Sequence, residues 1–292
     1  MSDEAAAFDA IAEEFFSVWF RYHPDVAAAA GVRGYEHLLP AQTDDELAAL
    51  GAWLETLVVA LEEIDYRLLD ADRRIDLRLM FGAARVEHQE LLERDWRHRD
   101  PLRFLPVAEI YHLTLQQPSN IREVLSVLLG AIPDYLRLAL SQLRSMAELV
   151  APVLVDAAIE EAERGRCYLR ELVASPWLRR HCYSASEIEG LVDAACGALA
   201  AFAGALRDEI AGRAAGRLGC GPEHLRFLFR HRHFMHLDAK GARGALVSAL
   251  AGCQEETAEL CASLRTTPEE ALVHLREPVV EGSHRVDLCR AE

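Results

Sequence analysis

Three histidines and one aspartate, which can transfer protons or bind a metal, lie close together in RHRHFMHLD at 230–238, the histidine segment. They are His231, His233, His236 and Asp238. On a helix, His233 and His236 would share one face. Arg230 and Arg232 stand beside them, and fixed positive charge disfavours a bound cation and lowers the pKa of a nearby histidine. We therefore rank a solvated or packed helix end first, an acid–base or anion-binding site second, and a metal site third.

A second candidate is the Glu-x-x-His pair formed by Glu109 and His112. Residues three apart on a helix face the same way. A di-iron helical bundle uses two such pairs and two further carboxylates, whereas this chain holds one pair. Packing is the default interpretation. On the functional interpretation, Glu109, Tyr111 and His112 supply the acid and the base, and His233 or His236 is the second titrating group.

A third candidate is the alternation of charge in ARVEHQELLERDWRHRD at 84–100. Such alternation usually indicates a solvated helix face with pairs four residues apart. The functional alternative is that His88 or Glu87 lines the interior. An oxyanion that develops during a reaction needs a nearby cation, for which Arg85 or Arg232 is available. We therefore predict that Arg85, His88 and Arg232 bind substrate.

Other familiar catalytic motifs are missing from the sequence. It contains no His-Glu-x-x-His zinc motif, no Gly-x-Ser-x-Gly elbow, no phosphate-binding Walker loop and no dinucleotide fingerprint. The predicted chemistry therefore uses no metal and no cofactor.

The composition limits the partners and the location that we expect. The chain has 292 residues, 51% of them hydrophobic, and a formal charge of −16, which argues against nucleic acid and anionic membranes as partners. Its seven cysteines form no CxxC pair, as is usual for reduced thiols. The acidic start MSDEAAAFDA does not resemble a signal peptide, and charges interrupt the apolar runs before 18 residues. We expect a cytoplasmic protein.

Helical periodicity runs through nearly the whole sequence, and no sustained alternation of period two indicates a strand. Within 70–98 the apolar stripe would place Ile75, Leu79 and Val86 inward. We predict an all-α bundle of about ten helices in one domain, 1–292, with a central cavity and an irregular tail at 278–292. The expected helices are 4–22, 25–30, 44–66, 70–98, 104–117, 120–131, 133–149, 152–174, 184–217, 221–235, 240–265 and 268–276.

Several blocks of the sequence together resemble a known family. The first is FFSVWFRYHPDVAAAAGVRGYEHLLP, with His23-Pro24, Gly31, Tyr35 and Leu39-Pro40. The later blocks are RRIDLRLM at 73–80, RDWRHRDPL at 94–102, APVLVDAAIEEAERGRCYLREL at 151–172 and LRFLFRHRHFMHLDAKGARGAL at 225–246. These blocks resemble the DUF885 family of bacterial helical proteins, and the similarity is patchy but covers nearly the whole chain.

The chain departs from this family in length and in one motif. Full-length members are about twice as long, and their second half resembles a zinc metallopeptidase with a His-Glu pair and then Pro-Gly-His-His. Nothing here matches that motif, so the resemblance covers the helical N-terminal half alone. It implies a helical shell that walls one side of a substrate channel, and it does not imply peptidase activity.

Two functions are compatible with these observations. The first is a stand-alone, metal-free enzyme that binds a small organic substrate in a helix-lined cavity. It would perform acid–base chemistry of a lyase, dehydratase or cyclase in bacterial secondary metabolism. The alternative is a non-catalytic helical protein that completes a separately encoded metallopeptidase-like subunit. The expected partners are a small molecule and, in addition, a second copy of the chain or another protein.

Overall fold

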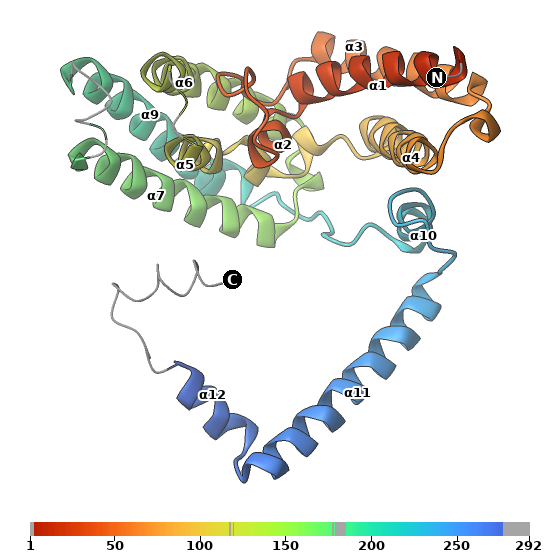
Figure 1. Cartoon of the computed structure of the whole chain (residues 1–292). Helices are drawn as coiled ribbons and strands as arrows, with labels where there is room; N and C mark the ends of the chain where they lie inside the picture. The colour runs from red at the N-terminus through yellow and green to blue at the C-terminus, as the bar shows by residue number, and fades with distance from the viewer. Residues whose placement is uncertain (1–2, 117, 119, 177, 179–184, 277–292) are drawn as a thin grey trace. The chain divides into compact units, whose positions relative to one another are not determined.

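A computed structural model describes residues 3–116, 118, 120–176, 178 and 185–276 (Figure 1). Over this part of the chain, eleven α-helices, several short 3-10 turns and one π-helical turn account for the regular structure, and no strand occurs. The prediction of an all-α protein is confirmed. The predicted tail at 278–292 lies outside the described residues.

Contacts within the chain divide it into two compact units. Unit 1 comprises Met1–Gly221 and His231–Phe234, and unit 2 comprises Pro222–Arg230 and Met235–Glu292. Compactness does not establish separate folding, so the single domain remains a prediction.

The first core of unit 1 lies among three helices, which are drawn together in Figure 1: α1 (Asp3–Tyr22), α3 (Asp44–Glu63) and α4 (Ala71–Glu93). The short helix α2 (Pro24–Ala29) follows α1. The core holds leucines of α3 together with aromatic residues of α1, and its fully or nearly buried members include Phe8, Phe15, Leu50, Leu54 and Leu61. A capping box begins α3: the amide of Glu46 donates to Thr43 Oγ1 at 3.2 Å, and the Glu46 carboxylate accepts from the Thr43 amide at 3.0 Å.

The face of α4 that is buried agrees only in part with the predicted one. Val86 is buried as predicted, but Ile75 and Leu79 are 58% and 50% exposed, and Met80, Gly82 and Ala84 are buried instead. The inward stripe of α4 is built mainly from small residues, which a hydrophobicity pattern weighs too lightly.

The second core of unit 1 lies among α5 (Val107–Gln116), α6 (Ile121–Ser145), α7 (Pro152–Ala174) and α9 (Ala185–Ala205) (Figure 1). Two separate helices were expected at 120–131 and 133–149, but α6 runs unbroken through Pro133. Proline removes one backbone hydrogen bond and disfavours a helix interior. The apolar face of α6 is nevertheless buried on both sides of it, at Leu129 and Leu136, so packing stabilises the continuous helix.

Two helices of this second core are long and apolar enough to cross a membrane by length and composition alone. They are α6 and the segment Ile188–Ile210, in which α9 continues into one π-helical turn (Leu206–Ile210) and ends before the predicted limit of 217. The helices pack against each other, and core helices of soluble proteins pass the same test. The absence of a membrane partner therefore remains a prediction.

The connection between the two cores is fixed by a buried arginine. The predicted helix 70–98 ends at Glu93, and two short 3-10 turns follow, η2 (Trp96–His98) and η3 (Pro101–Phe104). The Arg97 guanidinium donates to the carbonyl of Gln42 at 2.9 Å and to Asp44 Oδ1 at 2.7 Å, and it also pairs with Asp95 at 2.6 Å. This network ties the connection to the start of α3.

Unit 2 contains most of α10 (Pro222–His231), all of α11 (Ala239–Leu264) and α12 (Pro268–Arg276). The helix expected at 221–235 ends at His231, and Phe234 has a φ of +52° that a helix does not allow. Asp238 caps α11, since the amide of Gly241 donates to its Oδ1 at 2.7 Å.

Candidate functional site

A cleft of about 210 Å³ opens in unit 1 where the junction of α1 and α2 meets α4, η3 and the start of α5. Its charged and titratable lining residues come from four separate segments. They are Tyr22, His23, Asp25, Glu87, Arg103 and Glu109. We call this the acid–base cleft.

His23 is held in the acid–base cleft by the break in the chain that Pro24 causes. The residue before a proline avoids the helical conformation, so α1 stops and the imidazole turns inward. Its ring lies against Trp19, with centroids 4.3 Å apart, and its side chain is 12% exposed. Burial lowers the pKa of His23 to about 4, although Asp25 opposes this, and the cation of Arg103 lowers it further. His23 is therefore neutral at physiological pH.

Glu87 of α4 faces His23, with 3.6 Å between Glu87 Oε1 and His23 Nε2. Burial raises the pKa of Glu87 to about 7, with a further contribution from Glu90, while Arg103 and Arg232 oppose the shift. Between about pH 4 and pH 7 both side chains are thus uncharged, and the contact is a neutral pair rather than an ion pair. In that state the protonated Glu87 carboxyl group faces a buried imidazole nitrogen that has no hydrogen-bond partner among the described residues and can accept a proton.

Glu109 supplies a second buried carboxyl group from the first turn of α5. Burial raises its pKa to about 7 against the effect of a backbone hydrogen bond, and Asp25 adds to the rise. Among the described residues, no hydrogen-bond partner is present for its buried Oε2 atom or for the buried hydroxyl of Tyr135. Burial and the charge of Glu109 both raise the pKa of Tyr135, which therefore stays protonated. Unpaired buried oxygens are costly, and they are common where a substrate completes the hydrogen bonding.

The acid–base cleft therefore combines two carboxyl groups that titrate near neutral pH with one neutral imidazole and one arginine. A carboxyl group of this kind donates or accepts a proton at physiological pH with nearly equal ease, as efficient general acid–base catalysis requires. Perturbed pKa values that gather in a cleft are typical of functional sites.

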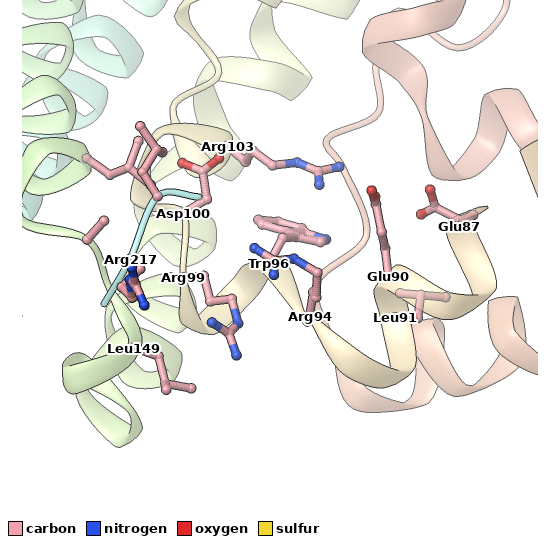
Figure 2. Close-up of a pocket in the computed structure, with 13 residues that line it drawn as sticks. Glu87, Glu90, Leu91, Arg94, Trp96, Arg99, Asp100, Arg103, Leu149 and Arg217 are labelled. Atoms are coloured by element: carbon pink, nitrogen blue, oxygen red, sulfur yellow. The ribbon is translucent and has the colours of Figure 1, made fainter. Parts of the chain in front are cut away.

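A second cleft of about 200 Å³ adjoins the first and shares Glu87, Trp96 and Arg103 with it (Figure 2). The Arg103 guanidinium lies over the Trp96 ring, 4.6 Å from its centroid. Three further arginines line this second cleft, which we call the arginine cleft. They are Arg94, Arg99 and Arg217.

The structure places one of the three residues predicted on α5 in a cleft. Glu109 lines the acid–base cleft, but neither Tyr111 nor His112 lines either cleft. Tyr111 is 49% exposed and packs edge-on against Tyr168 of α7, with centroids 6.0 Å apart. Of the Glu-x-x-His pair, Glu109 alone lines the acid–base cleft.

The residues predicted to bind substrate lie on α4 and after α10, outside the linings of both clefts. Arg85 pairs with Glu62 of α3 at 3.0 Å, and His88 lies 3.1 Å from Glu55 of the same helix. Arg232 lies 4.0 Å from Glu90, which lines the arginine cleft. Arg85 and His88 therefore stabilise the packing of α4 on α3, and Arg232 acts on the cleft through Glu90 and Glu87.

The histidine segment does not form one cluster. His233 is exposed and belongs to unit 1, His236 is exposed and belongs to unit 2, and Asp238 caps α11. Among the residues that the structure describes, no group of three or more His, Cys, Asp or Glu side chains is arranged to hold a metal. His236 and Asp238 do line a broad surface depression in unit 2 with Arg226 and Arg230.

Sequence reasoning missed His23 and Arg103, which line the acid–base cleft. A lone histidine before a proline indicates a helix end, and nothing local shows that the end is buried. Glu87 was named as an interior alternative, and its burial at 14% exposure agrees with that alternative. One signal was available: His23, Asp100-Pro101 and Arg103 all stand at helix breaks, where side chains turn toward neighbouring elements.

Comparison with known proteins adds information about the fold alone. No family model and no curated protein matches the chain. A solved structure from Shewanella oneidensis, described as a proposed lipoprotein of unknown function, superposes with a TM-score of 0.70 at 14% sequence identity. The match covers 88% of this chain and 48% of that one, so the chain spans about half the length of this structural neighbour.

Proposed function

We propose that this chain is an enzyme that performs acid–base chemistry on a small organic substrate in the acid–base cleft. The observation that carries the proposal is the pair of largely buried carboxyl groups, Glu87 and Glu109, whose pKa values are both raised to about 7 in one cleft. The class of reaction is that of a lyase, dehydratase or cyclase. A cytoplasmic location belongs to the same proposal.

The chemistry can be written for the elimination of water. The ionised carboxylate of Glu109 removes a proton from carbon, and the protonated Glu87 gives its proton to the departing hydroxyl group, so that a C–H and a C–O bond break while a C=C bond forms. The neutral imidazole of His23, whose Nε2 lies 3.6 Å from Glu87 Oε1, would accept a hydrogen bond from the protonated carboxyl group after a small movement and would hold it in that orientation. The Arg103 guanidinium lies beside Glu87 and would stabilise an oxyanion on the substrate. Arg103 thus takes the role that the sequence suggested for Arg85 or Arg232.

The test is a screen of hydroxy acids and carbonyl compounds for turnover by NMR, with Glu87→Gln and Glu109→Gln as active-site variants. Arg85→Gln is the matched control, because it removes a charge from α4 outside the two clefts. We expect turnover by the wild type and by Arg85→Gln, with a bell-shaped dependence on pH centred near neutrality. Turnover by Glu87→Gln and Glu109→Gln at the rate of the wild type would refute the proposal.

A second function is favoured by one observation, the match to about half of a longer structure. In that alternative the chain is a non-catalytic helical protein that completes a separately encoded metallopeptidase-like subunit, as the resemblance to DUF885 proteins suggested. Co-expression with the C-terminal half of a DUF885 protein tests it. A one-to-one complex on gel filtration, with peptidase activity that neither part has alone, would support this alternative, and separate elution would oppose it.

A further inference from the structure

Four arginines gather at the arginine cleft in a chain whose formal charge is −16 (Figure 2). They are Arg94, Arg99, Arg103 and Arg217. The acidic residues in the same lining are Glu87, Glu90 and Asp100. A strongly acidic protein repels anions over most of its surface, so a local excess of guanidinium groups points to a specific requirement for positive charge.

The acids of the arginine cleft have partners of their own. Glu90 lies 4.0 Å from Arg232, and Asp100 Oδ1 accepts a hydrogen bond from the amide of Leu102 at 3.0 Å. Glu87 faces His23. None of the three is therefore committed to Arg99 or Arg217.

Two of the arginines keep their donors available. Among the described residues, no hydrogen bond or ion pair engages the side chain of Arg99 or Arg217. Arg94 gives one hydrogen bond, from Nη1 to the carbonyl of Cys220 at 3.3 Å, and retains its other donors. By contrast, Arg144 of unit 1 forms a two-point pair with Glu209, at 2.6 and 2.7 Å. Each guanidinium carries five N–H donors in a plane that matches a carboxylate or phosphate group.

The backbone around Arg217 is fixed by a close approach. The amide of Gly216 donates to the carbonyl of Val150 at 2.9 Å, and a Cβ added to Gly216 would lie 1.9 Å from the carbonyl oxygen of Leu149. Only glycine fits there, so the chain runs tightly along the start of α7 and delivers Arg217 to the cleft. A preorganised backbone lowers the entropic cost of holding a ligand.

We propose that the arginine cleft binds the anionic group, a carboxylate or a phosphate, of the substrate on which the acid–base cleft acts. This inference rests on the proposed function, and it assigns the substrate to the class of small organic anions. In the view of Figure 2, Arg99 and Arg217 lie on one side of the Trp96 ring, and the Arg103 guanidinium and the carboxyl groups of Glu87 and Glu90 lie on the other. The anionic group occupies the first side, and the reacting carbon extends past Trp96 toward Glu87.

The test is isothermal titration of the full chain with inorganic phosphate, pyrophosphate and citrate as separate probes at low ionic strength. Arg99→Gln and Arg217→Gln remove the two unengaged guanidinium groups. Arg137→Gln is the control, because Arg137 is an exposed arginine of α6 that pairs with Asp134 outside the cleft. We expect saturable binding of at least one probe, a loss of about tenfold to hundredfold in affinity for each cleft variant, and no change for the control. Preference for citrate over the phosphates would identify the group as a carboxylate, and the reverse preference would identify a phosphate.

Three results would overturn the inference: no saturable binding of any probe, equal losses in Arg99→Gln and Arg137→Gln, or unchanged turnover in Arg99→Gln and Arg217→Gln. The last result would leave the acid–base proposal standing, because the enzyme would then act on a neutral substrate. Conversely, Glu87→Gln should retain the probe while losing turnover. Anion binding by the wild type without turnover of any substrate would contradict the proposed function and leave the anion site standing.

Discussion

The histidine segment looks like a reactive site in the sequence but not in the structure, whereas the reverse holds for His23. The histidine segment concentrates three imidazoles and a carboxylate in nine residues, yet His233 and His236 are exposed and Asp238 is a helix cap. His23 stands alone in the sequence, but in the structure it is buried against Trp19 and faces Glu87. Chemical potential follows burial and neighbouring charge more closely than it follows the density of reactive residue types along the chain.

The largest expected effect is on catalysis, in which substitutions in the acid–base cleft and in the histidine segment should differ most. Glu87→Gln or Glu109→Gln should lower the turnover rate by about 10²- to 10⁴-fold, the usual contribution of a general acid or base. His233→Ala and His236→Ala should stay within about twofold of the wild type. Steady-state rates on one substrate measure all four variants, and a large loss in His233→Ala would reverse the comparison.

The second prediction concerns stability at alkaline pH. Because the pKa of Glu87 rises from 4.5 to about 7 on folding, its stabilising contribution is complete below pH 4.5 and is lost as pH rises to about 7 and beyond. At pH 8 the ionised and desolvated Glu87 destabilises the folded state. Glu87→Gln removes this cost and should raise the free energy of unfolding at pH 8 by up to about 3 kcal/mol. Denaturant titrations at pH 5 and pH 8 measure the change, and the gain should fall below about 1 kcal/mol at pH 5.

His23 gives a contribution of opposite sign. Its pKa falls from 6.5 to about 4, so its contribution is complete above pH 6.5 and is lost as pH falls toward 4. If Glu87→Gln raised the free energy of unfolding equally at pH 5 and pH 8, folding would not raise the pKa of Glu87.

The third prediction tests how the histidine segment is attached to unit 1. A Cβ on Gly82 of α4 would lie 2.2 Å from the carbonyl oxygen of His231 and 3.1 Å from Cζ of Phe234. Gly82→Ala should therefore destabilise unit 1 by about 2 kcal/mol, a typical cost of overpacking. Gly51→Ala in α3, where nothing lies within 4 Å, should stabilise the chain by about 0.5 to 1 kcal/mol. Thermal unfolding compares the two, and equal effects would show that His231–Phe234 does not pack on α4.

The smallest expected effect distinguishes a cap from a ligand. Asp238→Ala should cost about 1 kcal/mol, because α11 loses its N-cap, and Asp238→Asn or Asp238→Ser should recover most of that loss. Helicity by circular dichroism follows the change. Stoichiometric bound metal in the wild type that disappears in Asp238→Ser would show that the residue is a ligand as well.

The fold was largely predictable, because helical periodicity survives wherever one face packs against a core. The inward leucines of α3 and the aromatic stripe of α1 show this directly. Two errors have physical reasons. Pro133 does not end α6, because packing on both sides outweighs one lost hydrogen bond, and α4 buries small residues rather than Ile75.

The site was predictable only in fragments. Glu109 was named as a candidate and Glu87 as an alternative, and both line the acid–base cleft. His23 and Arg103 were not found, because they are 80 residues apart in sequence and meet through the packing of helices. Their roles depend on desolvation, which a single sequence does not reveal.

The sharing of Glu87, Trp96 and Arg103 by the two clefts has a thermodynamic consequence. An anion beside Arg103 would weaken the positive potential that holds down the pKa of Glu87, so the carboxyl group would take up a proton as the ligand binds. By linkage, affinity for the anion should rise as pH falls through 7, and the heat of binding should depend on the ionisation enthalpy of the buffer. Binding of the anion would then protonate Glu87, the proposed general acid, and so supply the proton that the reaction consumes.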